Sequence, residues 1–154
     1  MKIYDIYSGS GDFVERTLSN LHEHHFTFDG IQYRCIEAFL QSLKCADPFQ
    51  AEQFYGLDGI GAYRMGKKFQ GWKKEQTLYY KGQPMHRLSD AYDGLIYNAY
   101  LSMFEQCPKF RKALEMSKDG DLTHTMGCKD PTNTILTESE FVDILGDIRE
   151  QYIF

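Results

Sequence analysis

Apolar residues in the second half of the chain recur every three or four positions, and this helical period limits the possible folds more than any other feature. One apolar stripe predicts a helix over about residues 89–106, begun by Ser89-Asp90 and ended before Pro108. Its members are Leu88, Tyr92, Leu95, Ile96, Ala99 and Met103. A last helix is expected after Thr137-Glu138-Ser139-Glu140, which has the spacing of a capping box. These segments predict a mainly helical protein.

The N-terminal third combines short strand patterns with another helix. Residues 3–7 alternate apolar and polar side chains, as a short strand does. In the segment 26–33, Asp29-Gly30 lies between two aromatic runs, which is a strong local signal for a tight β-hairpin. The period then becomes helical over about residues 35–45.

Weaker signals complete the map. We expect helices after Asp47-Pro48, over about residues 59–68 and from Pro108 to about Met116, and a strand over residues 122–125. The chain has neither βαβ alternation nor a phosphate-binding glycine loop. The predicted fold class is therefore α+β, mainly helical, with a small set of short strands. A length of 154 residues suits a single domain, 1–154.

The N-terminus, the lack of long apolar runs and the cysteines indicate the cellular compartment of the protein. The N-terminus lacks the apolar core of a signal peptide, and no run of about 18 apolar residues indicates a membrane span. The four cysteines are far apart and form no CxxC pair, so they are expected to be reduced thiols. We therefore expect a cytoplasmic protein that does not bind membranes.

The charge of the chain is unevenly distributed. The net charge of −5 argues against a protein that coats nucleic acid non-specifically. Between Arg64 and Arg87, however, seven basic residues stand against one acid, Glu75. This segment is either a solvated lysine face or a surface that meets phosphate groups, and the charge pattern alone leaves both open.

Glu37, Gln41 and Lys44 are four and seven residues apart and form a polar stripe on the helix predicted at 35–45. Such a stripe is usually the solvated face of an amphipathic helix. If it lines a cleft instead, it supplies a carboxylate held near the backbone N–H groups of a first helical turn, with a lysine two turns away.

Two further features have more than one interpretation. Trp72, the only tryptophan, is either a core residue or a plate on which a base stacks. His22, His24 and His25 cluster in one loop, but no second group with metal-ligand spacing accompanies them. We therefore expect no metal site.

The order of several short motifs resembles the NADAR (YbiA-like) family along nearly the whole chain. They are Leu18-Ser19-Asn20, the segment 26–44 with Glu37, Gln41 and Lys44, then Ala62, Gly66-Lys67-Lys68, Gly71-Trp72-Lys73, the stretch from Leu95 through Asn98 to Phe104, the stretch from Pro108 to Leu114, and Leu145-Gly146-Asp147-Ile148-Arg149. No single motif is strong, but their order and spacing together are fairly specific. The resemblance implies a YbiA-like single domain.

The resemblance also implies hydrolysis of an N-glycosidic bond of a phosphorylated ribose, either ADP-ribose on guanine of DNA or RNA or a ribose phosphate of the riboflavin pathway. Such hydrolysis passes through an oxocarbenium-like ribose and requires no cofactor. Glu37 would be the catalytic carboxylate and Asp130 a second acid. The substrate-binding residues would be Asn20, Gln41, Lys44, Lys67 and Trp72.

This chain departs from the family pattern before the last helix. Many members carry Asp-x-x-Trp-Gly there, whereas this chain has the segment 124–134, in which Asp130 is the candidate for the acid and no tryptophan occurs. The alternatives therefore include a module that binds ADP-ribose or a nucleotide without cleaving it. A helical protein whose polar stripe is merely solvated is a third possibility.

Overall fold

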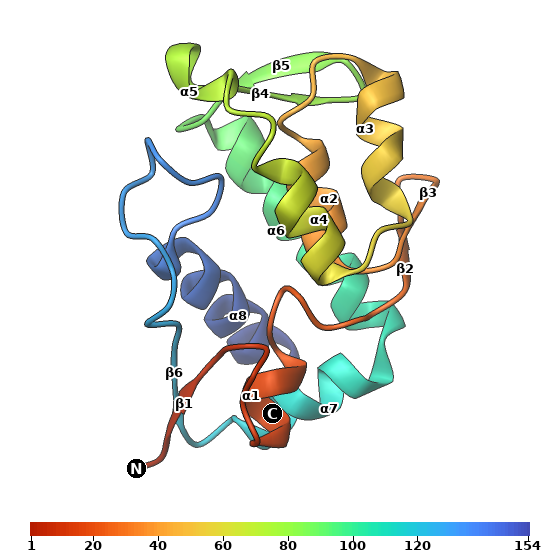
Figure 1. Cartoon of the computed structure of the whole chain (residues 1–154). Coiled ribbons are helices and arrows are strands. Elements are labelled where there is room, and N and C mark those ends of the chain that lie inside the picture. Colours follow the sequence, from red (N-terminus) through yellow and green to blue (C-terminus); the bar gives the residue numbers. More distant parts are fainter.

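A computed structural model describes all residues, 1–154, as eight helices and six short strands (Figure 1). The helices are α1 (Phe13–Thr17), α2 (Ile36–Ser42), α3 (Pro48–Tyr55), α4 (Gly59–Gly66), α5 (Trp72–Glu75), α6 (Asp90–Gln106), α7 (Pro108–Met116) and α8 (Glu138–Tyr152). The strands are β1 (Ile3–Asp5), β2 (Phe26–Phe28), β3 (Ile31–Tyr33), β4 (Thr77–Tyr80), β5 (Gln83–His86) and β6 (Asp121–Thr123). The predicted α+β, mainly helical class is confirmed.

The strands form three separate pairs. β1 and β6 are parallel, with Ile3 opposite Asp121, although more than 100 residues of chain separate them. β2–β3 and β4–β5 are antiparallel hairpins. Because two strands alone are only marginally stable, each pair depends on the helices packed against it. Most core residues come from helices, and Figure 1 shows the strand pairs at the periphery, from which Phe26, Tyr33 and Leu78 reach into the core.

Both hairpins turn through two residues with positive φ, as type I′ turns do. Asp29 and Gly30 have φ of 52° and 81°, and Lys81 and Gly82 have φ of 50° and 81°. The first hairpin is the predicted one. The two turns lie side by side, since Lys81 Nζ is 2.9 Å from Asp29 Oδ2 and Tyr80 donates a hydrogen bond to the same oxygen at 2.8 Å.

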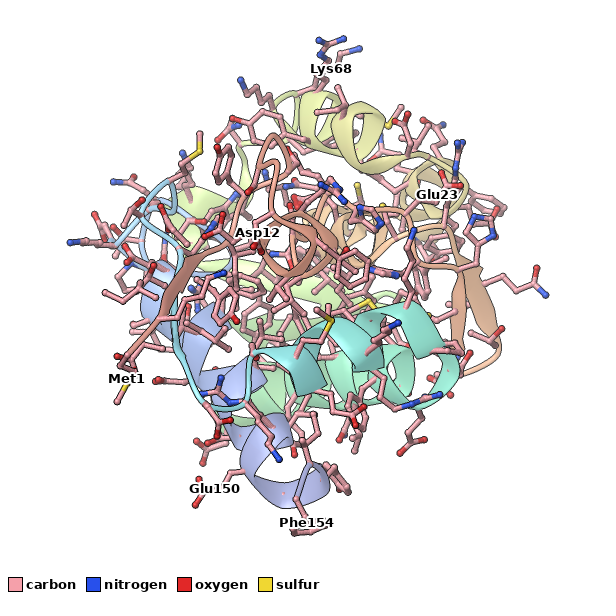
Figure 2. The ribbon with its side chains drawn as sticks, turned by 90° about the horizontal axis from the view of Figure 1, so that it is seen from below. Met1, Asp12, Glu23, Lys68, Glu150 and Phe154 are labelled. Atoms are coloured by element: carbon pink, nitrogen blue, oxygen red, sulfur yellow. The ribbon has the colours of Figure 1, made fainter.

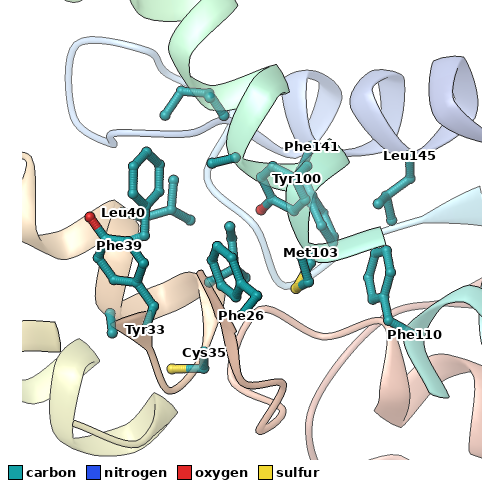
Figure 3. Close-up of a cluster of buried hydrophobic side chains, with 14 of the residues drawn as sticks. Phe26, Tyr33, Cys35, Phe39, Leu40, Tyr100, Met103, Phe110, Phe141 and Leu145 are labelled. Atoms are coloured by element: carbon teal, nitrogen blue, oxygen red, sulfur yellow. The ribbon is translucent and has the colours of Figure 1, made fainter. Parts of the chain in front are cut away.

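Helix α2 lies at the centre of the fold. All seven of its residues are buried, and it packs against α3, α4, α6 and β3. Figure 3 shows Phe39 and Leu40 of α2 beside Tyr33 on one side of the core, with Tyr100 and Phe141 on the other. The rings of Tyr33 and Phe39 meet edge to face, 5.4 Å apart. The polar residues of α2 must therefore be accommodated inside the protein.

Side-chain caps place the ends of the long helices where the sequence predicts them. Ser89 Oγ accepts a hydrogen bond from the N–H of Tyr92 at the start of α6. At α8, Thr137 and Glu140 form both hydrogen bonds of a capping box. These caps fix the direction in which each helix enters the core.

The structure differs from the sequence-based map in several places. α2 ends at Ser42, so Lys44 lies beyond the helix rather than on it. β6 comprises Asp121–Thr123, slightly earlier than the predicted 122–125. The helices α1 and α5 and the hairpin β4–β5 were not predicted. None of the helices is both long and apolar enough to cross a membrane.

Gly59 opens α4 where the backbone of Leu21 passes very close. A Cβ atom at Gly59 would overlap the carbonyl oxygen and Cα of Leu21, and neither can move away as a side chain can. We expect Gly59→Ala to lower the free energy of unfolding by about 3 kcal/mol, the upper part of the range for overpacking. Urea denaturation measures this change.

Gly94→Ala is the matched control. Gly94 lies on the exposed face of α6, and a Cβ there would meet nothing within 4 Å. Alanine is favoured over glycine inside a helix by about 1 kcal/mol, so this variant should be more stable than wild type. If Gly59→Ala and Gly94→Ala have the same free energy of unfolding, the close packing of Gly59 against the backbone of Leu21 is not required for stability.

Candidate functional site

Glu37 is a nearly buried carboxylate in the first turn of α2, 8% exposed. Its Oε1 accepts a hydrogen bond from Gln41 Nε2 at 2.8 Å, whereas no protein donor reaches Oε2 and no ion pair is formed. Burial raises the pKa of Glu37 above its ordinary value, although the Gln41 hydrogen bond and the nearby charges of Lys44 and His124 oppose this. Glu37 and Gln41 therefore do not form a solvated helix face.

Asn20 connects Glu37 to α6. The carbonyl of Asn20 accepts the N–H of Glu37 at 3.3 Å, and its side-chain oxygen accepts the hydroxyl of Tyr100 at 2.6 Å. Tyr100 is fully buried, and burial raises its pKa well above the ordinary value, so it stays a neutral donor. The side-chain NH₂ of Asn20, which is partly exposed, donates to no protein group and is free to bind a ligand.

His124 lies in the same neighbourhood, and sequence reasoning did not select it. The residue directly follows β6, its Nδ1 is 2.7 Å from the carbonyl oxygen of Ile6, and its ring packs edge-on against Phe141 at 5.2 Å. Its charge acts on Glu37. The only sequence signal was its place in the segment 124–134, where the family motif is missing.

Lys44 and Trp72 line one cavity of about 220 Å³, together with Phe69, Glu75 and Tyr79. Lys44 Nζ donates to the carbonyl of Gly66 at 3.2 Å, and burial lowers the pKa of Lys44 despite the nearby charge of Glu37. The Trp72 indole is 4% exposed, and its buried Nε1 has no hydrogen-bond partner. The structure thus brings these two predicted residues together.

Lys67 and Asp130 do not line the cavity that Lys44 and Trp72 share, and neither residue forms a hydrogen bond with Glu37. Lys67 is exposed, with its Nζ 4.6 Å from the centre of the Tyr63 ring. Asp130 lies in the exposed loop before α8 and accepts hydrogen bonds of 2.8–2.9 Å from Thr132 and Asn133. The bond from the Thr132 backbone is the first cause that lowers the pKa of Asp130. No hydrogen bond or ion pair connects Asp130 to Glu37.

The seven basic residues between Arg64 and Arg87 have three different environments, and one of these residues, Lys81, is paired with Asp29. Exposed cations without an ion pair lie on and after α4, where Lys68 points outward from the molecule (Figure 2). They are Arg64, Lys67, Lys68, Lys73 and Lys74. Arg87, by contrast, is fully buried and paired with Glu140. Arg87 therefore belongs neither to a solvated lysine face nor to a phosphate-binding surface.

Within the histidine loop, His24 has a structural role. It is 5% exposed, and its Nε2 is 2.8 Å from the carbonyl oxygen of Thr17. Burial lowers the pKa of His24 to about 4, so the ring is neutral near pH 7. It packs between the rings of His22 and Phe110.

Comparison with known proteins places the chain in a family. The family model for bacteriophage protein GP30.3 matches residues 12–150. The uncharacterized 17.1 kDa protein in the Gp30–rIII intergenic region of Enterobacteria phage T4 is 38% identical over 136 residues, which cover 86% of this chain and 88% of that protein. The NMR structure of the E. coli protein YbiA aligns with a TM-score of 0.65 and 18% identity over 97% of this chain and 83% of YbiA. The chain therefore belongs to the family of bacteriophage protein GP30.3 and has the YbiA-like fold that its sequence predicted.

Proposed function

We propose that this protein hydrolyses the N-glycosidic bond of a phosphorylated ribose, with Glu37 as the carboxylate that acts at the anomeric carbon. The observation that carries the proposal is the environment of Glu37, a buried carboxylate with one unbonded oxygen and no ion pair. A charge held in this way reduces the stability of the fold. Such costs are typical of functional sites, where the pKa of an acid is tuned for chemistry.

The reaction makes use of a desolvated negative charge. As the bond between C1′ and the base nitrogen breaks, its electron pair leaves with the base and positive charge develops on the ribose. An ionised Glu37 stabilises that charge, and more strongly than in water because its surroundings are of low dielectric. The carboxylate also accepts the proton of the water whose oxygen bonds to C1′.

Nearby residues offer contacts for the remainder of such a substrate. The free amide NH₂ of Asn20 suits a ribose hydroxyl or a base edge, and Gln41 holds the carboxylate in place. Lys44 and Trp72 share a cavity that suits a phosphate beside a base. Lys67 and the exposed cations around it would attract a phosphate-rich ligand. Both ADP-ribose on guanine of nucleic acid and ribose phosphates of the riboflavin pathway have these groups.

The test is a direct assay with both substrate classes. Wild-type protein in excess is mixed with an oligonucleotide carrying ADP-ribose on guanine and, separately, with a ribose-phosphate N-glycoside of the riboflavin pathway. Chromatography then measures released ADP-ribose or ribose phosphate. We expect release from at least one substrate, and a Glu37→Gln protein should release far less. If wild-type protein in excess cleaves neither, the proposal is wrong.

A non-catalytic module that binds ADP-ribose or a nucleotide is the second candidate. It is favoured by the position of Asp130, whose carboxylate is engaged within its own loop and leaves Glu37 without the second acid that the family resemblance implies. Such a module would retard the modified oligonucleotide in a gel and leave the ADP-ribose attached. The same incubation therefore distinguishes the two functions.

A further inference from the structure

N-glycoside hydrolysis requires a second proton transfer, because the departing base nitrogen must gain a proton. Asp130 is poorly suited to supply it. The residue is exposed, its oxygens accept three hydrogen bonds, and its pKa is lowered, chiefly by the backbone N–H of Thr132. Another donor near Glu37 is therefore needed.

His124 is held so that one ring nitrogen remains available. A carbonyl oxygen can only accept, so the 2.7 Å contact with Ile6 places a proton on Nδ1. Nε2 then has no protein partner, and the residue is partly exposed. Gly127 leaves room beside this edge of the ring, because a Cβ atom there would lie 2.6 Å from Cδ2 and 3.2 Å from Nε2. The imidazole is thus fixed by the protein through Nδ1, while Nε2, beside Gly127, has no hydrogen-bond partner and is not fully buried.

A continuous set of contacts leads from this imidazole to Glu37. Phe141 packs against both His124 and Tyr100, with ring centres 5.2 and 6.0 Å away, and Figure 3 shows Phe141 beside Tyr100. Tyr100 donates to Asn20, whose carbonyl accepts the N–H of Glu37. The two titratable groups are therefore joined by one set of packed side chains and hydrogen bonds, although 87 residues of sequence separate them.

We propose that His124 is the proton donor to the departing base, an inference that rests on the proposed N-glycosidase function. The imidazolium gives its Nε2 proton to the base nitrogen as that nitrogen takes the electron pair of the C1′–N bond. Glu37 accepts the proton of the attacking water, whose oxygen bonds to C1′. After product release Glu37 loses its proton to solvent and the imidazole gains one, so the cycle closes without a further reactant.

Carboxylates from three elements lie around His124. Asp5 on β1 and Glu37 on α2 interact with its charge, and Glu138 on α8 lies beside it at Gly127. A general acid is active only while it carries its proton, so the proposed role predicts that activity falls on the alkaline side of the pH profile.

His124→Asn tests the proposal. The asparagine NH₂ takes the place of Nδ1 and keeps the hydrogen bond to Ile6, whereas the Nε2 position is lost. We expect kcat to fall by about 100-fold or more, KM to stay within threefold, and the alkaline limb of the pH profile to disappear. His25→Asn, at an exposed histidine outside the cluster, is the matched control and should behave as wild type. His124→Gln provides a second variant, because an amide at the Nε2 position cannot transfer a proton.

The outcomes separate the two proposals. If wild-type protein cleaves and His124→Asn retains kcat within threefold with its alkaline limb intact, the role of His124 is wrong while the N-glycosidase function stands. The same holds if Asp130→Asn removes the alkaline limb and His124→Asn does not. If wild-type protein cleaves no substrate, the proposed function itself fails. Should His124→Asn not fold, the pH profile of His124→Gln decides.

Discussion

Replacing Glu37 with glutamine is expected to lower turnover by about two to four orders of magnitude and, in the same variant, to raise the melting temperature near pH 7. Glutamine keeps the shape of the side chain and removes the charge that would stabilise the ribose cation. It also removes the cost of burying that charge. Opposite effects on activity and stability are expected of a residue kept for chemistry.

The pH dependence of the stability change follows from the raised pKa of Glu37, which is caused first by burial. A carboxyl with a higher pKa in the folded than in the unfolded state stabilises the fold below its unfolded pKa, about 4.3, and loses this contribution as pH rises through the folded pKa. The free energy of unfolding of the wild-type protein should therefore be close to that of Glu37→Gln near pH 4 and lower than that of the variant towards pH 7. The new amide also offers an N–H to the buried Oε1 of Gln41, which has no partner.

Melting temperatures measured between about pH 4 and 8 test this expectation, with the pH range set by the unfolded pKa of a glutamate. Glu52→Gln on the exposed side of α3 is the matched control and should leave both stability and turnover unchanged. If Glu37→Gln melts at or below the wild-type temperature throughout, the carboxylate is not desolvated in solution. If its turnover equals that of wild type, Glu37 has no part in the reaction.

The elements that the sequence predicted are those specified by neighbouring residues. Ser89 and Thr137 cap α6 and α8 through hydrogen bonds within their own first turns. Asp29-Gly30 similarly adopts the positive φ values of its hairpin within two residues. Such interactions depend little on the remainder of the fold, so spacing alone reveals them.

The elements that were not predicted depend on distant contacts or on weak signals. β5 contains Pro84 and its turn is Lys81-Gly82, so the local pattern did not indicate a hairpin. Tertiary contacts support it instead, since Lys81 pairs with Asp29 and the N–H of Tyr79 donates to the carbonyl of Leu43. The two residues of each contact lie far apart in the sequence, so no local pattern reveals the hairpin.

In the candidate site too, some features could be predicted from the sequence and others could not. The spacing of Glu37 and Gln41 placed both on one side of a helix, and their hydrogen bond matches this. Sequence could not show whether that side was solvated, because burial depends on which elements pack against α2. Nor could it select His124, which joins the cluster only because β1 pairs with β6 and brings Ile6 to its ring.

Arg87 and Glu140 form the other buried charged group of the fold. The Arg87 guanidinium donates to both Glu140 oxygens, at 2.5 and 3.0 Å, and to the carbonyl of Thr134 at 2.9 Å. Glu140 also completes the capping box of α8 by accepting the N–H of Thr137. Burial alone would raise the pKa of Glu140, but the hydrogen bonds from Arg87 and Thr137 hold it below the ordinary value. This ion pair therefore fastens the start of α8 to the segment before α6.

Arg87→Met is expected to lower the free energy of unfolding at pH 7 by about 3 kcal/mol, the lower end of the range for breaking a buried ion pair, because Glu140 is 28% exposed and keeps some hydration. Lys81→Met breaks an ion pair whose side chains are about half exposed, so this matched control should lose less than about 1 kcal/mol.

The contribution of Glu140 to stability depends on pH. Since the pKa of Glu140 is lowered, its contribution is present above its unfolded pKa of about 4.3 and is lost as pH falls through the folded value. The difference between wild type and Arg87→Met should therefore narrow in acid, which urea denaturation at several pH values measures. Equal losses in the two variants would mean that burial of Arg87 adds nothing to the strength of its ion pair.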